Sequence, residues 1–69
     1  MKPQLPLTPR EEQVLVLIGL GNKNHQVAKE LGNTVDVVNK QIASAKAKLN
    51  AKTKEQAVLK ALQQHLISM

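Results

Sequence analysis

The feature that most constrains the fold of this chain is a central segment, residues 26–49, whose pattern predicts a short helix, a tight turn and a longer helix. The short helix carries Val27 and Leu31 on its inner face. Gly32 lets the backbone reverse direction without a side-chain penalty, and Thr34 is well placed to cap the helix that follows. Two helices joined in this way form a helix-turn-helix, a unit that lays its second helix in the major groove of DNA.

The longer helix, expected from Thr34 to about Leu49, has one apolar face and one outward face. The apolar stripe consists of Val38, Ile42, Ala45 and Leu49. The opposite side carries Asp36, Lys40, Ala43, Ser44 and Ala47, flanked by Asn39, Lys46 and Lys48. This outward face is the one that would meet DNA. The alanines either let the helix approach base edges closely or simply favour helix formation, and the sequence leaves both explanations open.

The flanking residues predict two further helices and a cap for the short one. Thr8, with Pro9 after it and Glu11 three residues on, forms a capping box that opens a helix ending at residues 19–21. Asn24 is a plausible cap for the short helix. A second capping box begins at Thr53 and opens a last helix that reaches about Leu66. The expected fold is therefore all-α, with four helices.

Two segments divide the chain. Residues 1–6 contain two prolines and are predicted to form an extended lead-in or linker, and residues 7–69 form one small domain. The longest apolar stretch, residues 14–20, is far shorter than the ~20 residues of a membrane span. The first residues also lack the apolar run of a signal peptide, so a cytoplasmic location is expected.

The distribution of charge favours a polyanionic partner. The formal net charge is +5, and residues 37–53 contain no acid while Lys40, Lys46, Lys48 and Lys52 fall within them. A clustered positive patch is typical of nucleic-acid binders, although a simply solvated lysine face is the alternative. The chain has no aromatic residue on which unpaired bases would stack, so double-stranded DNA is the expected partner.

Catalysis and metal binding find little support in the sequence. The chain has no cysteine, and no cluster of histidine and carboxylate residues shows the spacing of metal ligands. His25 is expected to face solvent or phosphate, and His65 to be half-buried on an apolar face. We therefore expect neither an enzyme nor a cofactor or metal site.

The last helix carries more apolar residues than one buried face needs. Ala57 and Ala61 lie on one side, while Leu59 and Leu66 lie nearly opposite. A two-fold dimer is the commonest way to bury such a second face, and scattered exposed leucines are the alternative. The residues expected at this dimer interface are Val58, Leu59, Leu62, His65 and Leu66.

From residue 7 to about residue 61 the chain resembles the DNA-binding domain of the LuxR/GerE-type (NarL/FixJ-type) transcription regulators. The opening run, residues 7–11 followed by Val14 and Leu15, matches the family's first signature. Later signature positions are matched by Gly21, Asn24, Val27, Ala28, Leu31, Gly32, Thr34, Val38, Lys48, Leu49, Gln56 and Ala57. Each match is weak by itself, but the ordered set is specific.

The resemblance implies roles for residues of this chain. Base contacts are expected from Asp36, Asn39, Lys40 and Ala43. Phosphate contacts are expected from Lys23, Asn24, Thr34, Ser44, Lys46 and Lys48. The resemblance also implies a homodimer on an inverted repeat, paired through the last helix. Members usually carry an N-terminal sensing domain, so the chain is either a stand-alone regulator or part of a longer protein.

The chain departs from the family in the helix that would read DNA. Family members commonly have threonine, lysine and histidine where this chain has Val37, Asn39 and Gln41. Asn39 could pair with adenine, and Asp36 could either accept from cytosine or act only as a charge at the helix N-terminus. A protein-interaction module on the same scaffold, with reduced DNA contact, is therefore the alternative function.

Overall fold

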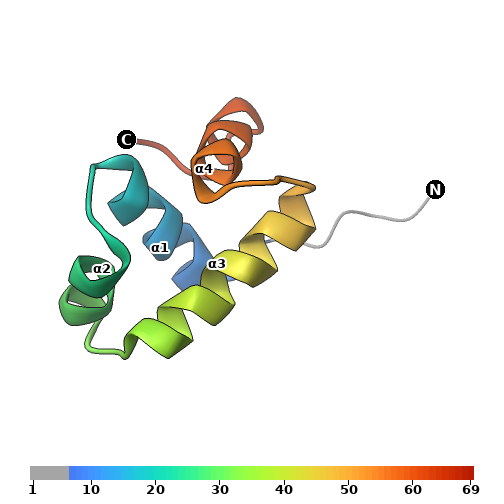
Figure 1. The fold of residues 1–69 in the computed structure, drawn as a ribbon. Coiled ribbons are helices and arrows are strands. Elements are labelled where there is room, and N and C mark those ends of the chain that lie inside the picture. Colours follow the sequence, from blue (N-terminus) through green and yellow to red (C-terminus); the bar gives the residue numbers. More distant parts are fainter. Residues whose placement is uncertain (1–6) are drawn as a thin grey trace.

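The structure, a computed structural model, describes residues 7–69, and these residues form four helices and no strand (Figure 1). The helices are α1 (Pro9–Gly19), α2 (Asn24–Leu31), α3 (Val35–Leu49) and α4 (Lys54–Gln63). The expected all-α fold of four helices is confirmed. The lead-in expected for residues 1–6 lies outside the described residues and stays a prediction.

The predicted N-terminal caps explain where three of the helices begin. The hydroxyl of Thr8 accepts from Glu11 N, and Thr8 N donates to the Glu11 carboxylate, which completes the capping box of α1. Thr34 caps α3 by accepting from Val37 N at 3.3 Å. Thr53 caps α4 in the same way. Each of these bonds satisfies an amide that the helix itself cannot pair.

Two details of the predicted caps were wrong. The residue that caps α2 is Lys23, and Asn24 is the first residue of the helix. Lys23 N donates to the side chain of Gln26, so α2 begins with only half of a capping box. At α4 the side chain of Gln56 accepts from Lys52 N at 2.6 Å, whereas a capping box would have it accept from Thr53 N, one residue later.

A residue in the left-handed conformation follows the last turn of three helices, α2, α3 and α4. The one after α4 corrects the predicted length of that helix. Gly32 ends α2 with φ of 68°, and Asn50 ends α3 with φ of 54°. His65 adopts φ of 58° just beyond α4, and Leu66 N returns to Ala61 O at 2.8 Å. This turn closes α4 at Gln63, one turn before the predicted end, because it takes up the last carbonyls of the helix.

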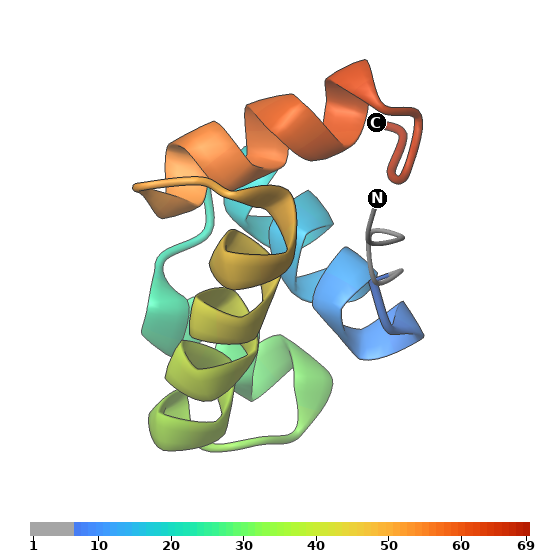
Figure 2. The same ribbon diagram turned by 90° about the vertical axis from the view of Figure 1, so that its right-hand side faces the viewer.

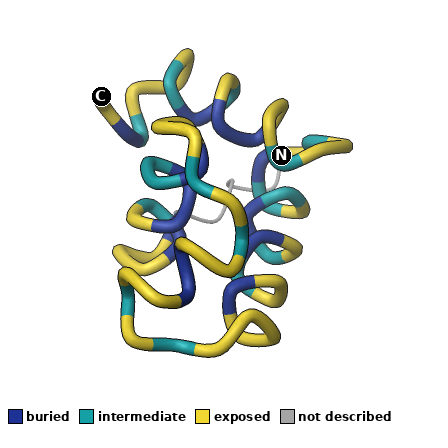
Figure 3. Tube along the Cα trace, turned by 60° about the vertical axis from the view of Figure 1, so that its left-hand side comes forward, coloured by how far each residue is buried: buried dark blue, intermediate teal, exposed yellow. Residues whose placement is uncertain are grey.

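The core lies between α1 and the three helices that pack on it (Figure 2). The largest fully buried side chains are Val14, Leu15, Val27 and Val38. Figure 3 shows the buried positions of the helices turned inward and the exposed positions turned outward. Ile67 is also buried, since the chain folds back after α4 and returns this residue to the core. Through these contacts α3 is held on one side while its other side stays exposed.

Candidate nucleic-acid interface

The outward face of α3 is the candidate interface. The predicted stripe of Val38, Ile42, Ala45 and Leu49 is buried, which confirms the orientation expected for this helix. The four residues predicted to touch bases, Asp36, Asn39, Lys40 and Ala43, are all exposed. Whether they touch bases stays a prediction. Burial of one stripe fixes the rotation of α3, so these four side chains are presented together.

The turn between α2 and α3 sets the position of this face. Gly32 adopts φ of 68°, and Asn33 N donates to Ala28 O at 2.8 Å, which closes the end of α2. Thr34 is exposed beside the first turn of α3, where its backbone is extended and its hydroxyl caps the helix. An anion approaching this end of α3 would meet the positive end of the helix dipole.

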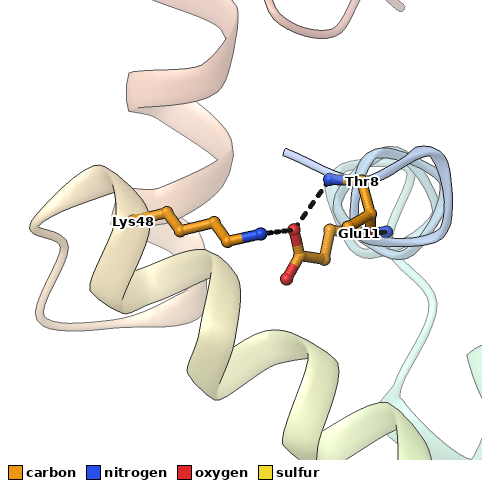
Figure 4. A network of polar contacts seen from close by, with 3 residues as sticks. All are labelled: Thr8, Glu11 and Lys48. Carbon is orange, nitrogen blue, oxygen red and sulfur yellow. Dashed lines mark hydrogen bonds and ion pairs between the residues drawn. The ribbon is translucent and has the colours of Figure 1, made fainter. Parts of the chain in front are cut away.

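The remaining predicted phosphate contacts divide into outward and inward residues. Lys23 is exposed at the start of α2, and Lys46 is half-buried in the last turn of α3. Lys48 and Ser44, in contrast, face α1. Lys48 Nζ lies 2.8 Å from Glu11 Oε1, with the lysine side chain 18% exposed and the glutamate side chain 5% (Figure 4). Ser44 also donates a hydrogen bond to the Glu11 carboxylate.

Lys48 is engaged by Glu11 in this structure, and whether Lys48 and Ser44 contact phosphate stays a prediction. A buried carboxylate needs compensating donors, and these two side chains together with Thr8 N supply them. Burial would raise the pKa of Glu11, but the hydrogen bonds from Lys48, Ser44 and Thr8 and the charge of Lys48 hold it below the ordinary value of 4.5. This group of contacts ties α1 to α3.

A second polar group joins three helices beside the outward face. Asn24 Nδ2 donates to Asn39 Oδ1 at 2.9 Å, and Lys54 Nζ donates to Asn24 Oδ1 at 2.9 Å. The side chain of Asn24 thus already bonds at both its nitrogen and its oxygen. The sequence prediction did not include Lys54 in the site, because its partner lies thirty residues earlier and only the fold brings the two together.

Two exposed valines at the start of α3 were also missed by the sequence prediction. Val35 is 40% exposed and Val37 is 36% exposed. They lie on either side of Asp36, so the beginning of the outward face is partly apolar. The departure of Val37 from the usual threonine was the available signal. Such apolar side chains suit contact with thymine methyl groups.

The residues predicted at a dimer interface do not form one exposed face. Val58 is buried in the core of its own domain, and Leu66 is half-buried against the same core. His65 is exposed in the turn after α4, which corrects its expected half-buried place on a helix face. Leu59, which is 54% exposed, and the half-buried Leu62 are the apolar residues of this set that α4 leaves at the surface.

A groove on another side of the domain differs in charge from the α3 face. It lies along α1, α2 and the C-terminal segment, and Glu12 and Glu30 are among its lining residues. Carboxylates repel phosphate, so this groove does not suit DNA. Within residues 7–69 no three histidine or carboxylate side chains gather as a metal site, and no helix is long and apolar enough to cross a membrane.

Four helices with a helix-turn-helix, whose second helix is buried on one side and exposed on the other, define a domain of the DNA-binding helix-turn-helix class. Residues 5–61 match the family described as bacterial regulatory proteins, luxR family. The chain is 33% identical over 66 residues to the transcriptional regulatory protein LiaR of Bacillus subtilis (strain 168). That match covers 96% of this chain and 31% of LiaR.

The fold is also similar to a solved structure of the transcription factor GerE. The TM-score is 0.84 at 22% sequence identity, and the match covers 97% of both chains. This likeness shows the fold. Since the family match extends over most of the chain, the protein belongs to the LuxR family of bacterial regulators and is a LuxR-type helix-turn-helix domain.

Proposed function

We propose that this domain binds double-stranded DNA through the outward face of α3 and thereby regulates transcription. The observation that carries the proposal is the joint exposure of Asp36, Asn39, Lys40 and Ala43 on a helix whose opposite stripe is buried. In this arrangement Lys40 and Ala43 lie toward base edges, and Lys23, Lys46 and the Thr34 cap lie toward the phosphates on either side.

The affinity of this interface depends strongly on salt. If Lys23 and Lys46 each neutralise one phosphate, the logarithm of the binding constant falls with a slope of about −1.8 against the logarithm of salt concentration. A rise from about 50 mM to about 200 mM salt then lowers the affinity for duplex DNA by about 12-fold.

Fluorescence anisotropy with a labelled random duplex tests this proposal. We expect Lys46→Ala to lower both the affinity and the salt slope. Lys60→Ala removes the same charge from α4, where the amine bonds Asn50 O, and should leave both unchanged. Binding that ignores salt, or no binding to any duplex, would reject DNA as the partner and favour the protein-interaction alternative.

We further propose that two domains pair through α4 on an inverted repeat. The support is the exposure of Leu59 next to the half-buried Leu62 on the same helix. Sedimentation of Leu59→Glu tests it, with Gln64→Glu as a control that adds one negative charge at an exposed residue further round the helix end from Leu59. Dimers in the wild type and the control but not in Leu59→Glu are expected, and monomers throughout would exclude this interface.

Two further parts of the proposal are a sensing domain joined to this one and a cytoplasmic location. The chain spans about a third of the length of LiaR, so LiaR contains a further portion that this chain does not match. We propose that a sensing domain N-terminal to the present one controls it, and that the protein acts in the cytoplasm, where bacterial DNA lies. Limited proteolysis of the natural protein, followed by mass measurement, would show whether such a domain is joined to this one.

A further inference from the structure

A directed chain of hydrogen bonds runs from α4 through α2 to α3. Lys54 Nζ donates to Asn24 Oδ1, and Asn24 Nδ2 donates to Asn39 Oδ1, both at 2.9 Å. Within residues 7–69, α2 and α4 do not pack against each other. This chain of bonds therefore links the start of α4 to the outward face of α3 by way of α2.

The lysine fixes the direction of both bonds. An ammonium group has three donors and no acceptor, so only the oxygen of Asn24 can face Lys54. The nitrogen of Asn24 then faces Asn39, and only the oxygen of Asn39 can accept from it. The usual ambiguity between the oxygen and the nitrogen of an amide is thereby removed for both residues.

The orientation of Asn39 decides what it can offer to DNA. Asparagine pairs with adenine in a bidentate way, with its nitrogen donating to N7 and its oxygen accepting from N6. One of the two lone pairs of the Asn39 oxygen is taken by Asn24, so the nitrogen, which only donates, is the group of this side chain better placed to meet a base. Guanine presents two neighbouring acceptors, O6 and N7, and no donor at that edge.

We infer that Asn39 presents its amide nitrogen to DNA as a donor and selects guanine over adenine, with Asn24 and Lys54 acting as positioning residues. The inference rests on the proposed function, since it concerns the same face of α3. It replaces the expectation from sequence that Asn39 pairs with adenine. The specificity of this residue is set by its neighbours and not by its type alone.

Selection of bound sequences from a random duplex pool tests the inference. The wild type should enrich guanine at one position whose preference disappears in Asn39→Ala. In Asn24→Ala and in Lys54→Met the oxygen of Asn39 is released, and the ratio of adenine to guanine there should rise by about fivefold. Lys60→Met, which removes a charge from the same helix without touching Asn24, should keep guanine.

Several outcomes would overturn the inference. Adenine at the Asn39-dependent position of the wild type would do so, as would an unchanged ratio in both Asn24→Ala and Lys54→Met. NMR of the DNA-free protein provides a separate measurement: Lys54→Met should shift the side-chain amide signals of Asn24 and Asn39, and Lys60→Met should not. If these amide signals do not shift while DNA binding is intact, the chain of hydrogen bonds is wrong and the proposed function stands. If the selection enriches no duplex, the proposed function is wrong, and the base preference inferred for Asn39 is wrong with it.

Discussion

Replacing Lys48 by methionine removes the amine that neutralises a buried carboxylate while it keeps most of the length of the side chain. Lys48 Nζ lies 2.8 Å from Glu11 Oε1, and the Glu11 side chain is only 5% exposed. Removing one partner of a buried ion pair costs about 3–5 kcal/mol. Here Thr8 and Ser44 still donate to Glu11, and Lys48 is 18% exposed, so solvent screens part of the interaction. We expect a loss of about 2 kcal/mol, close to that of one hydrogen bond to a charged group.

Urea denaturation followed by circular dichroism measures this loss directly. For a domain of this size, about 2 kcal/mol corresponds to a fall in Tm of about 10 °C. Lys40→Met is the matched control, because it removes the same charge from the exposed face of the same helix and should change stability by less than about 0.5 kcal/mol. Equal stability of the two variants would refute the structural role of Lys48.

The pH dependence of stability provides a second check on the same pair. Burial raises the pKa of Glu11, but Lys48, Ser44 and Thr8 hold it below 4.5, so the unfolded chain takes up the proton at higher pH than the folded domain. The stabilisation is complete above pH 4.5 and is lost as pH falls through the lower folded value. In Lys48→Met burial remains and the pKa of Glu11 rises. The stability difference between the two proteins should shrink from about pH 7 to about pH 3, and a constant difference would contradict the mechanism.

Three further predictions concern the ends of the helices, and urea denaturation measures each of them. Thr34→Ala should lower the free energy of unfolding by about 1 kcal/mol and Thr34→Ser by less, because the hydroxyl caps α3; equal losses would argue against the cap. Gly32→Ala should cost about 1 kcal/mol through its positive φ alone, since an added Cβ would meet no atom within 4 Å; an unchanged stability would refute that strain. His65→Gly should raise stability by about 0.5 kcal/mol because glycine adopts φ near 58° more readily, and a loss would show that the imidazole has a role in the fold.

The sequence predicted those parts of the fold that depend on neighbouring residues. The hydroxyl caps at Thr8, Thr34 and Thr53 act within three residues, and each is present in the structure. The buried stripe of α3 follows from helical periodicity and is also confirmed. The end of α4 was misplaced, because a histidine indicates the left-handed conformation that His65 adopts much more weakly than a glycine would.

The side chains of the site could not all be placed from the sequence, because their partners are distant along the chain. Lys48 carries the charge of a phosphate contact, and only the packing of α1 on α3 directs it to Glu11, thirty-seven residues earlier. Asn39 likewise receives its orientation from Asn24, fifteen residues away, and indirectly from Lys54. Periodicity shows which face of a helix is outward, but it does not show which outward groups are already bonded.

NMR titration of the isotope-labelled protein with a short duplex at about 50 mM salt shows whether the outward face of α3 binds duplex DNA. We expect the largest changes in backbone amide signals at Thr34, Asn39, Lys40 and Ala43, with little change at Glu12 and Glu30 in the groove along α1 and α2. Changes centred on that groove, or no change at any ratio of DNA to protein, would show that the outward face of α3 is not a DNA-binding surface.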